Sequence, residues 1–288
     1  MAGGGGKEAT LRTFAGAVAL VTGGASGIGA GLGRDLARRG AVVVLADRDG
    51  EDARAEATRI AVAGGRAEGA TLDVRDAVAV DALVTEVFAR HGRLDCLFNN
   101  AGIAVGGEAR ELALEDWRDA VDVNLMGVVH GVRAAWPRMI GQGFGHVVNT
   151  ASMAAFMATA LAAPYGATKS ATVGLSRALR VEGAALGVRV SVLCPGVIRT
   201  PILEGGGRHG RVRNLLDPDV LKALVERVRP MDVDVFARKT LDDVARHRAV
   251  IVHPAWWRIL RLLNGVAPSL VEALARRELA RIQALRGR

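Results

Sequence analysis

A tyrosine and a lysine four residues apart are the pair of side chains in this sequence best suited to move a proton. Tyr165, the only tyrosine in the chain, and Lys169 begin a segment whose apolar residues recur with helical spacing. Positions i and i+4 of a helix share one face, so the phenol and the ammonium should converge. A nearby cation favours the phenolate, and we expect Lys169 to lower the pKa of Tyr165 from about 10. An amphipathic helix without chemistry has the same spacing, so the pair alone is not decisive.

A glycine-rich turn between a short apolar strand and a helix is the second feature. The strand is expected at 17–21 and the helix from Ile28 to Gly40. This arrangement points backbone N–H groups and a helix N-terminus at phosphate, and it predicts a dinucleotide site. The turn contains Gly23, Ser26, Gly27, Ile28 and Gly29.

An acidic residue follows the second predicted strand at a spacing typical of ribose recognition. Asp47 lies 18 residues after Gly29. A carboxylate there accepts hydrogen bonds from the ribose hydroxyls and repels a 2′-phosphate, so we expect NAD to be preferred over NADP. Arg48 is a basic neighbour that weakens this preference. A turn or helix N-cap is the alternative role for Asp47.

Apolar strands alternate with helices along most of the chain, which predicts a doubly wound α/β fold of about seven parallel strands with helices on both faces. Ligands of such sheets bind at the carboxyl ends of the strands, where Gly23, Asp47, Asp73, Asn99 and Gly102 are expected. The predicted strands cover 17–21, 42–46, 67–72, 94–98, 145–150, 188–194 and 249–252. The predicted helices cover 28–40, 51–63, 78–90, 114–140, 164–186, 218–228, 233–246 and 270–285, with a kink or break at Pro137.

Together these motifs resemble the short-chain dehydrogenase/reductase family, over residues 14–200 and more weakly over 232–253. The resemblance implies a Rossmann-like domain, a nicotinamide dinucleotide and a catalytic tetrad of Asn124, Ser152, Tyr165 and Lys169. It further implies that cofactor contacts come from the glycine turn and from Asp47, Arg48, Asp73, Val74, Asn100, Ala101, Gly102, Tyr165, Lys169, Pro195, Gly196, Val197, Ile198 and Thr200.

The implied reaction is hydride transfer between the nicotinamide and a secondary alcohol or ketone. Tyr165 would carry the proton, Lys169 would bind the nicotinamide ribose, Ser152 would orient the substrate oxygen, and Asn124 would hold a relay water. Apolar residues at 103–105 and 153–157, with Leu161, favour an uncharged, lipophilic substrate, although such residues also occur in ordinary cores. A non-catalytic dinucleotide-sensing regulator is the alternative from another class, against which the intact tetrad argues.

The chain ends depart from the expected single domain at 14–253. Residues 1–13 are expected to be a flexible leader, and 254–288 a helical extension with seven arginines and two glutamates. The extension could close the pocket, pack on a second subunit, or lie on a membrane surface in a steroid- or lipid-directed dehydrogenase. Packing is the favoured alternative.

Composition limits the remaining classes. The formal net charge is +8, and arginine-rich composition explains it better than nucleic-acid binding, because no basic helix with interleaved aromatic residues precedes the tail. Cys96 and Cys194 lie in apolar segments and are expected to be buried thiols, not a disulfide or metal pair. We expect a cytoplasmic homodimer or homotetramer without a metal.

Overall fold

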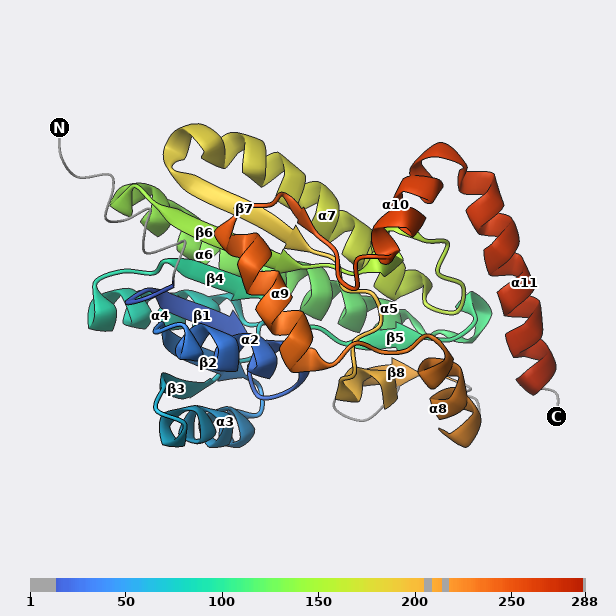
Figure 1. The fold of residues 1–288 in the computed structure, drawn as a ribbon, viewed down its shortest axis with the longest axis horizontal. Coiled ribbons are helices and arrows are strands. Elements are labelled where there is room, and N and C mark those ends of the chain that lie inside the picture. Colours follow the sequence, from blue (N-terminus) through green and yellow to red (C-terminus); the bar gives the residue numbers. More distant parts are fainter. Residues whose placement is uncertain (1–13, 205–208, 214–217, 287–288) are drawn as a thin grey trace.

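Seven parallel strands form the central sheet of the protein, in the order β3-β2-β1-β4-β6-β7-β9 (Figure 1). The computed structural model describes residues 14–204, 209–213 and 218–286. The strands are β1 (Val18–Thr22), β2 (Val42–Asp47), β3 (Arg66–Thr71), β4 (Cys96–Asn99), β6 (Gly145–Thr150), β7 (Val188–Leu193) and β9 (Val250–Ile251). This confirms the predicted Rossmann-like sheet, and strand ends differ from the predicted ones by one or two residues.

Helices cover both faces of this sheet, as predicted. The helices are α2 (Gly27–Arg38), α3 (Gly50–Val62), α4 (Ala77–His91), α5 (Leu114–Val121), α6 (Gly127–Gln142), α7 (Ala163–Gly183), α8 (Pro218–Arg227), α9 (Val233–Ala245), α10 (Trp257–Val266) and α11 (Pro268–Arg286). Apolar side chains of α2, α3 and α9 form one core cluster with the sheet, and those of α4, α6 and α7 form another. Successive residues of β1 alternate between these clusters: Ala19 and Val21 enter the first, Val18 and Leu20 the second.

The segment predicted as one helix from 114 to 140 is divided. Between α5 and α6, a single π-helical turn spans Asp122–Met126 and contains the buried Asn124. The predicted break at Pro137 is wrong, because α6 continues through it to Gln142. Ala134, Ala135 and Met139 of this stretch are buried in the second core cluster, and their packing offsets the backbone hydrogen bond that proline removes.

Three elements were not predicted. Strands β5 (Ala104–Gly106) and β8 (Gly210–Val212) form a separate parallel pair, too short for a period to be visible in sequence. Helix α10 occupies part of the tail, before the predicted helix α11. The predicted leader at 1–13 lies outside the described residues, as do 205–208, part of a polar segment at 205–210 that the sequence predicts to be a turn.

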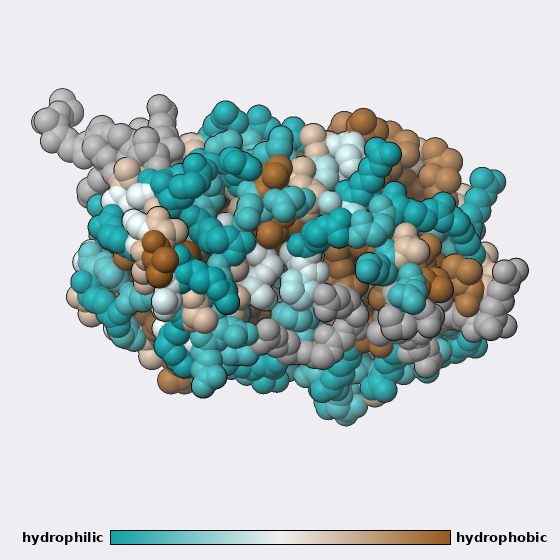
Figure 2. All heavy atoms as spheres, turned by 60° about the horizontal axis from the view of Figure 1, so that its bottom comes forward, coloured by the Kyte–Doolittle hydropathy of each residue, from teal (hydrophilic) through white to brown (hydrophobic). Residues whose placement is uncertain are grey.

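The helices α10 and α11 carry an exposed apolar stripe. Figure 2 shows apolar side chains gathered towards the end of the molecule that these helices form. The stripe consists of Trp256, Ile259, Leu262, Val266, Leu270 and Leu274, each 46% to 83% exposed. We call it the tail stripe.

We predict opposite stability effects for two glycines of α6. A Cβ on Gly131 would lie 2.0 Å from Asn99 Oδ1, so Gly131→Ala should destabilise the fold by about 1–3 kcal/mol. Gly141 has no such neighbour within 4 Å, so Gly141→Ala should stabilise it by about 0.5–1 kcal/mol through helix propensity. Urea unfolding of both variants checks the prediction, and equal effects of the same sign would contradict it.

Candidate active site

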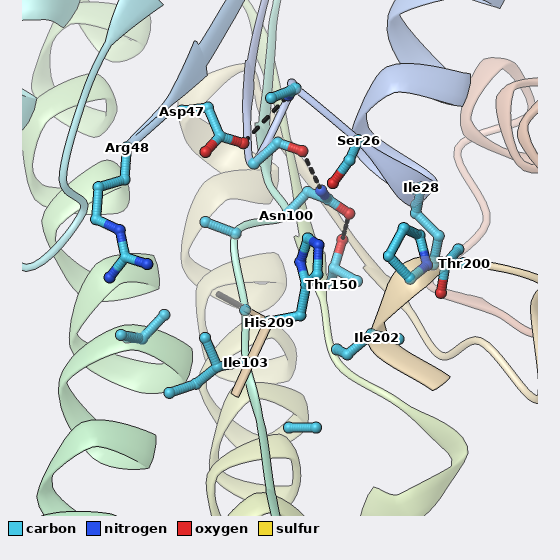
Figure 3. Close-up of a pocket in the computed structure, with 18 of the residues that line it drawn as sticks. Ser26, Ile28, Asp47, Arg48, Asn100, Ile103, Thr150, Thr200, Ile202 and His209 are labelled. Atoms are coloured by element: carbon cyan, nitrogen blue, oxygen red, sulfur yellow. Dashed lines mark hydrogen bonds between the residues drawn. The ribbon is translucent and has the colours of Figure 1, made fainter. Parts of the chain in front are cut away.

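A cavity of about 810 Å³ lies at the carboxyl ends of the strands. Its walls come from the residues that follow six strands of the sheet, which brings together segments distant in sequence. Figure 3 shows Asp47 and Arg48 on the side of the cavity opposite Ile28 and Thr200. The cavity therefore extends from the end of β2 to the start of α2 and the segment after β7.

The glycine turn after β1 is shaped by close backbone approaches. Gly23 has φ 66°, and a Cβ there would come 2.8 Å from Ala101 Cα. A Cβ on Gly29 would come 2.0 Å from the Gly23 carbonyl oxygen, so α2 can start against the turn only with glycine here. Ser26, the N-cap of α2, makes no side-chain capping hydrogen bond, and the first turn carries no acidic residue. The N-terminus of α2 thus suits an anionic group in the cavity.

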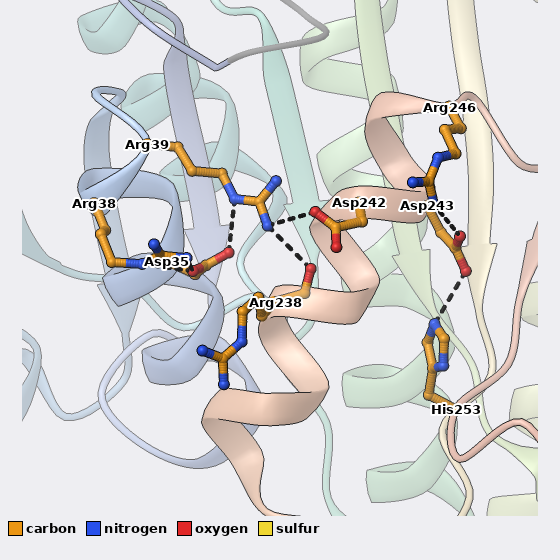
Figure 4. Close-up of polar contacts among 8 residues, drawn as sticks. All are labelled: Asp35, Arg38, Arg39, Arg238, Asp242, Asp243, Arg246 and His253. Carbon is orange, nitrogen blue, oxygen red and sulfur yellow. Dashed lines mark hydrogen bonds and ion pairs between the residues drawn. The ribbon is translucent and has the colours of Figure 1, made fainter.

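Helix α9 holds α2 in this position. Arg39 of α2 donates from Nε to Asp35 (2.8 Å) and from Nη2 to Asp242 of α9 (2.8 Å), as Figure 4 shows. On α9, the carboxylate of Asp243 forms a hydrogen bond with His253 Nε2 (3.0 Å), which holds the chain after β9. The half-exposed Asp242 thus joins α9 to α2, and the buried Asp243 joins α9 to the segment after β9.

Asn100 links the glycine turn to the other side of the cavity. Its backbone N–H donates to Thr22 Oγ1 (3.0 Å) and its Nδ2 donates to the Thr22 carbonyl (3.1 Å). Its Oδ1 accepts from Thr150 Oγ1 at the end of β6 (3.3 Å). The carbonyl of Thr150 in turn accepts from Lys169 Nζ (2.9 Å). One amide side chain thus ties the glycine turn to the lysine of α7.

Acidic and basic side chains alternate at the Asp47 end of the cavity. Asp47 Oδ2 accepts from the Ala25 N–H (3.1 Å), and its Oδ1 accepts from the Asp49 N–H (3.1 Å). These bonds fix the carboxylate at the cavity wall. Arg75 forms an ion pair with Asp73 (2.6 Å), and its hydrogen bond lowers the pKa of that carboxyl group.

Ser152, Tyr165 and Lys169 meet at the other end. Lys169 Nζ lies 5.6 Å from the centroid of the Tyr165 ring, which places both side chains on one face of α7. The Ser152 hydroxyl accepts from the Ala154 N–H (3.1 Å) and hydrogen-bonds the Tyr165 phenol. These three side chains line the same cavity as the glycine turn.

The pKa of Tyr165 is raised, not lowered, so the expected effect of Lys169 is wrong in this structure. Burial of the phenol raises the pKa and outweighs the hydrogen bond from Ser152, which lowers it. Burial also lowers the pKa of Lys169 to about 8. Both shifts leave the two groups largely protonated at neutral pH.

Asn124 is fully buried and does not line the cavity. Its Oδ1 accepts from the Ile103 N–H (2.8 Å) and its Nδ2 donates to the Ile103 carbonyl (3.0 Å). Both amide atoms therefore fix the backbone beside the cavity. The proposed relay water stays a prediction.

Of the predicted site residues, all but Gly29 and Asn124 line the cavity. Of the predicted substrate-pocket residues, Ile103 and Ala104 line it, while Val105 and Met153 are buried in the interior. Lining residues that sequence reasoning missed include Glu51, Arg54, Arg75 and Thr150. Glu51 and Arg54 lie on α3 directly after Asp47, a position that could have suggested them.

Comparisons with known proteins agree with this geometry. The family profile described as short chain dehydrogenase matches residues 17–208. A 1-deoxy-11-beta-hydroxypentalenate dehydrogenase from Streptomyces exfoliatus is 40% identical over 190 residues, which are 65% of this chain and 69% of that protein.

Two solved structures are similar over most of the chain. A short chain dehydrogenase/reductase from Burkholderia phymatum, in complex with NAD, has a TM-score of 0.80 and 30% identity, covering 90% of this chain and 96% of its own. A protein proposed to be an NAD(P)-dependent gluconate 5-dehydrogenase, from Beutenbergia cavernae and with NADP bound at low occupancy, has a TM-score of 0.75 and 31% identity, covering 86% of this chain and 99% of its own.

Fold and cavity define an oxidoreductase that uses a nicotinamide dinucleotide and acts on alcohol- or ketone-type substrates. The chain belongs to the short-chain dehydrogenase/reductase family. The resemblance stated from the motifs is thereby confirmed.

Other features of the described residues are simpler. Cys96 and Cys194 are buried free thiols, as predicted. Within the described ranges, no helix is both long and apolar enough to cross a membrane.

Burial of Lys169 predicts a pH dependence of stability. Between the folded pKa of about 8 and the unfolded value of about 10.4, the unfolded chain binds more protons, so the free energy of unfolding rises with pH. From pH 8 to 10 the gain relative to Lys169→Met should approach about 1.4 kcal/mol per pH unit. Urea unfolding at each pH measures it, with Lys222→Met, at an exposed position, as the matched control. Parallel profiles for the wild type and Lys169→Met would refute the burial effect.

Proposed function

We propose that the protein is an NAD(H)-dependent oxidoreductase that interconverts a secondary alcohol and a ketone, with an uncharged and lipophilic substrate. The observation that carries this proposal is the presence of Ser152, Tyr165 and Lys169 in one cavity with the glycine turn. A sensor of dinucleotides needs the turn but has no use for this set.

The chain's own groups divide the reaction between them. The dinucleotide, when bound, supplies or accepts the hydride at its nicotinamide ring. Ser152 is oriented by the Ala154 N–H, so its hydroxyl proton can be donated to the substrate oxygen beside Tyr165. Tyr165 gives its proton to that oxygen during ketone reduction. Lys169, still largely protonated at pH 7, contributes positive charge next to the phenol.

The raised pKa of Tyr165 favours one direction of the proposed reaction. Because the pKa of Tyr165 is raised, the protonated form that ketone reduction requires is the resting form. Alcohol oxidation needs the phenolate, which a cationic nicotinamide ring would favour. Asn124 would bind a relay water through its backbone carbonyl, because its side-chain amide already hydrogen-bonds the backbone of Ile103.

Tyr165→Phe should abolish turnover and leave dinucleotide binding intact. The variant removes the donated proton while the ring still packs in place, so kcat should fall by about 10²-fold or more. Stopped-assay rates with a ketone panel, together with the dinucleotide Kd from fluorescence titration, measure the two effects separately. Near-normal kcat would show that Tyr165 is not the proton donor.

We propose that NAD is preferred over NADP because of Asp47. Its carboxylate is fixed at the cavity wall and leaves a lone pair on each oxygen for ribose hydroxyls. The neighbouring Arg48 and Arg54, which line the same end, limit the preference.

The kcat/KM values for the two dinucleotides test this preference. Asp47→Ser should raise kcat/KM for NADP and lower it for NAD, together changing the ratio by about tenfold, because one charge-assisted contact of a half-buried carboxylate is lost. Glu51→Gln, which removes a charge at the same cavity end, is the matched control and should change the ratio little. An NADP preference in the wild type would refute the role of Asp47.

A membrane-surface, lipid-directed dehydrogenase is a second candidate, which the tail stripe favours. An exposed apolar helix face beside arginines such as Arg258 and Arg276 suits an anionic lipid surface. Packing of the stripe on a second subunit is the competing explanation, and it agrees with the homodimer or homotetramer that we propose for a cytoplasmic enzyme.

Liposome sedimentation separates these possibilities. If the stripe binds lipid, the triple variant Ile259→Ser, Leu262→Ser, Val266→Ser should lose sedimentation with phosphatidylglycerol vesicles. The double variant Val62→Ser, Val78→Ser removes equally exposed apolar side chains elsewhere and should retain it. No sedimentation of the wild type removes the membrane candidate, and a shift of the triple variant to a smaller oligomer supports subunit packing.

A further inference from the structure

A second cavity, of about 600 Å³, lies next to the first and is walled on one side by α11. Val197 and Leu203 line both cavities, so the two spaces border the same side chains. Figure 1 shows α8 and the end of α11 at the same end of the molecule. Ligand cavities commonly measure roughly 300–1,000 Å³, so this space can hold the body of a small organic molecule.

The second cavity is apolar inside and charged at its opening. Leu221 and Leu224 of α8, Val212 of β8 and Ile282 of α11 contribute its apolar walls. Glu278 and Arg281, which also line it, have side chains 56% and 50% exposed. An occupant would therefore lose water from an apolar body and keep a polar end near solvent.

The backbone at Leu161 favours a role in binding. Leu161 lines the second cavity and has φ 62°, a left-handed conformation that is unfavourable for a branched side chain. Its carbonyl accepts from the Gly107 N–H (2.7 Å), and a Cβ on Gly106 would lie 2.9 Å from the same oxygen. The strained conformation is thus held by close contact with β5, and it places the leucine in the cavity wall.

Polar contacts fix the other walls. Arg213, directly after β8, donates from Nε and Nη2 to Asp116, which is fully buried (2.7 and 3.1 Å). Gln283, next to Ile282 on α11, donates from Nε2 to Glu108 Oε1 (3.1 Å). Both contacts attach the cavity walls to the segment around α5, so the second cavity is a defined space.

We propose that this second cavity binds the apolar body of an elongated ketone or secondary alcohol, and that Ile282 of the C-terminal extension determines how long a substrate is accepted. The inference rests on the proposed function, since the carbonyl of such a substrate lies between Ser152 and Tyr165. The carbon chain passes Val197 and Leu203 into the second cavity. The extension is therefore part of the substrate site.

A homologous series of 2-alkanones from four to eleven carbons tests the proposal. In the wild type, kcat/KM should rise up to about fourfold per methylene until the second cavity is filled. Ile282→Trp, which fills the cavity, should lower kcat/KM for the longest ketones at least tenfold relative to its kcat/KM for 2-butanone. Leu274→Trp, at a half-exposed position of the same helix, is the matched control and should preserve the whole series. A wild-type series without length dependence, or an unchanged series in Ile282→Trp, overturns the proposal.

Binding of 1-anilinonaphthalene-8-sulfonate tests the cavity without turnover. The probe has an apolar body and an anionic end, so Ile282→Trp should weaken its binding at least tenfold, Leu274→Trp should not, and 2-undecanone should displace it. No displaceable binding to the wild type, or equal binding to Ile282→Trp, overturns the proposal. If the probe behaves as expected but no ketone or alcohol is turned over, the proposed function fails and the cavity assignment stands.

Discussion

The hydrogen bonds of Asn100 are the constraint on which the rest of the site depends. Its backbone and side chain hold Thr22, where β1 ends and the glycine turn begins. Its Oδ1 holds Thr150, whose carbonyl accepts from Lys169. Parallel strands bring their carboxyl ends to one edge in any such sheet. Asn100 converts this nearness into a fixed geometry between the glycine turn and Lys169.

Burial sets the protonation states of Tyr165 and Lys169. It raises the pKa of Tyr165 above its usual value and lowers that of Lys169 to about 8, so the two pKa values move apart and Lys169 loses its proton first. A charged group of a bound dinucleotide would act on a partly desolvated phenol, where an electrostatic interaction is stronger than in water. In the proposed reaction, these pKa shifts favour Tyr165 as the donor of a proton to a carbonyl oxygen.

The C-terminal extension supports the site from two directions. Trp257 of α10 packs so closely on Gly196 that a Cβ there would lie 2.1 Å from its indole nitrogen, and Gly196 lines the first cavity. Helix α11 closes the second cavity. Deletion of the whole extension would disturb both cavities. Single substitutions on α10 or α11 therefore distinguish its effects on the two cavities better than a deletion does.

Local patterns in the sequence predicted the sheet and most of the site, because apolar periods and glycine turns express interactions between near neighbours. They could not predict the π-helical turn at Asn124, because the side-chain amide of Asn124 hydrogen-bonds the backbone of Ile103, which lies far from it in sequence. The sign of the Tyr165 pKa shift also escaped prediction, since the i+4 spacing shows the cation but not the burial. The second cavity needs Leu161, α8 and α11 together, which only the folded chain brings into contact.

The most direct measurement of the central claim is made on Asn100→Ala, in one preparation whose melting temperature shows that it folds. The dinucleotide Kd is measured first, and kcat is then measured at saturating dinucleotide. One amide holds both the glycine turn and Thr150, whose carbonyl accepts from Lys169. We therefore predict that the Kd rises and that kcat falls, each by about tenfold. A tenfold change corresponds to the loss of roughly 1.4 kcal/mol of hydrogen bonding. A weakened Kd with unchanged kcat would contradict the account, because the two halves of the site would then be independent.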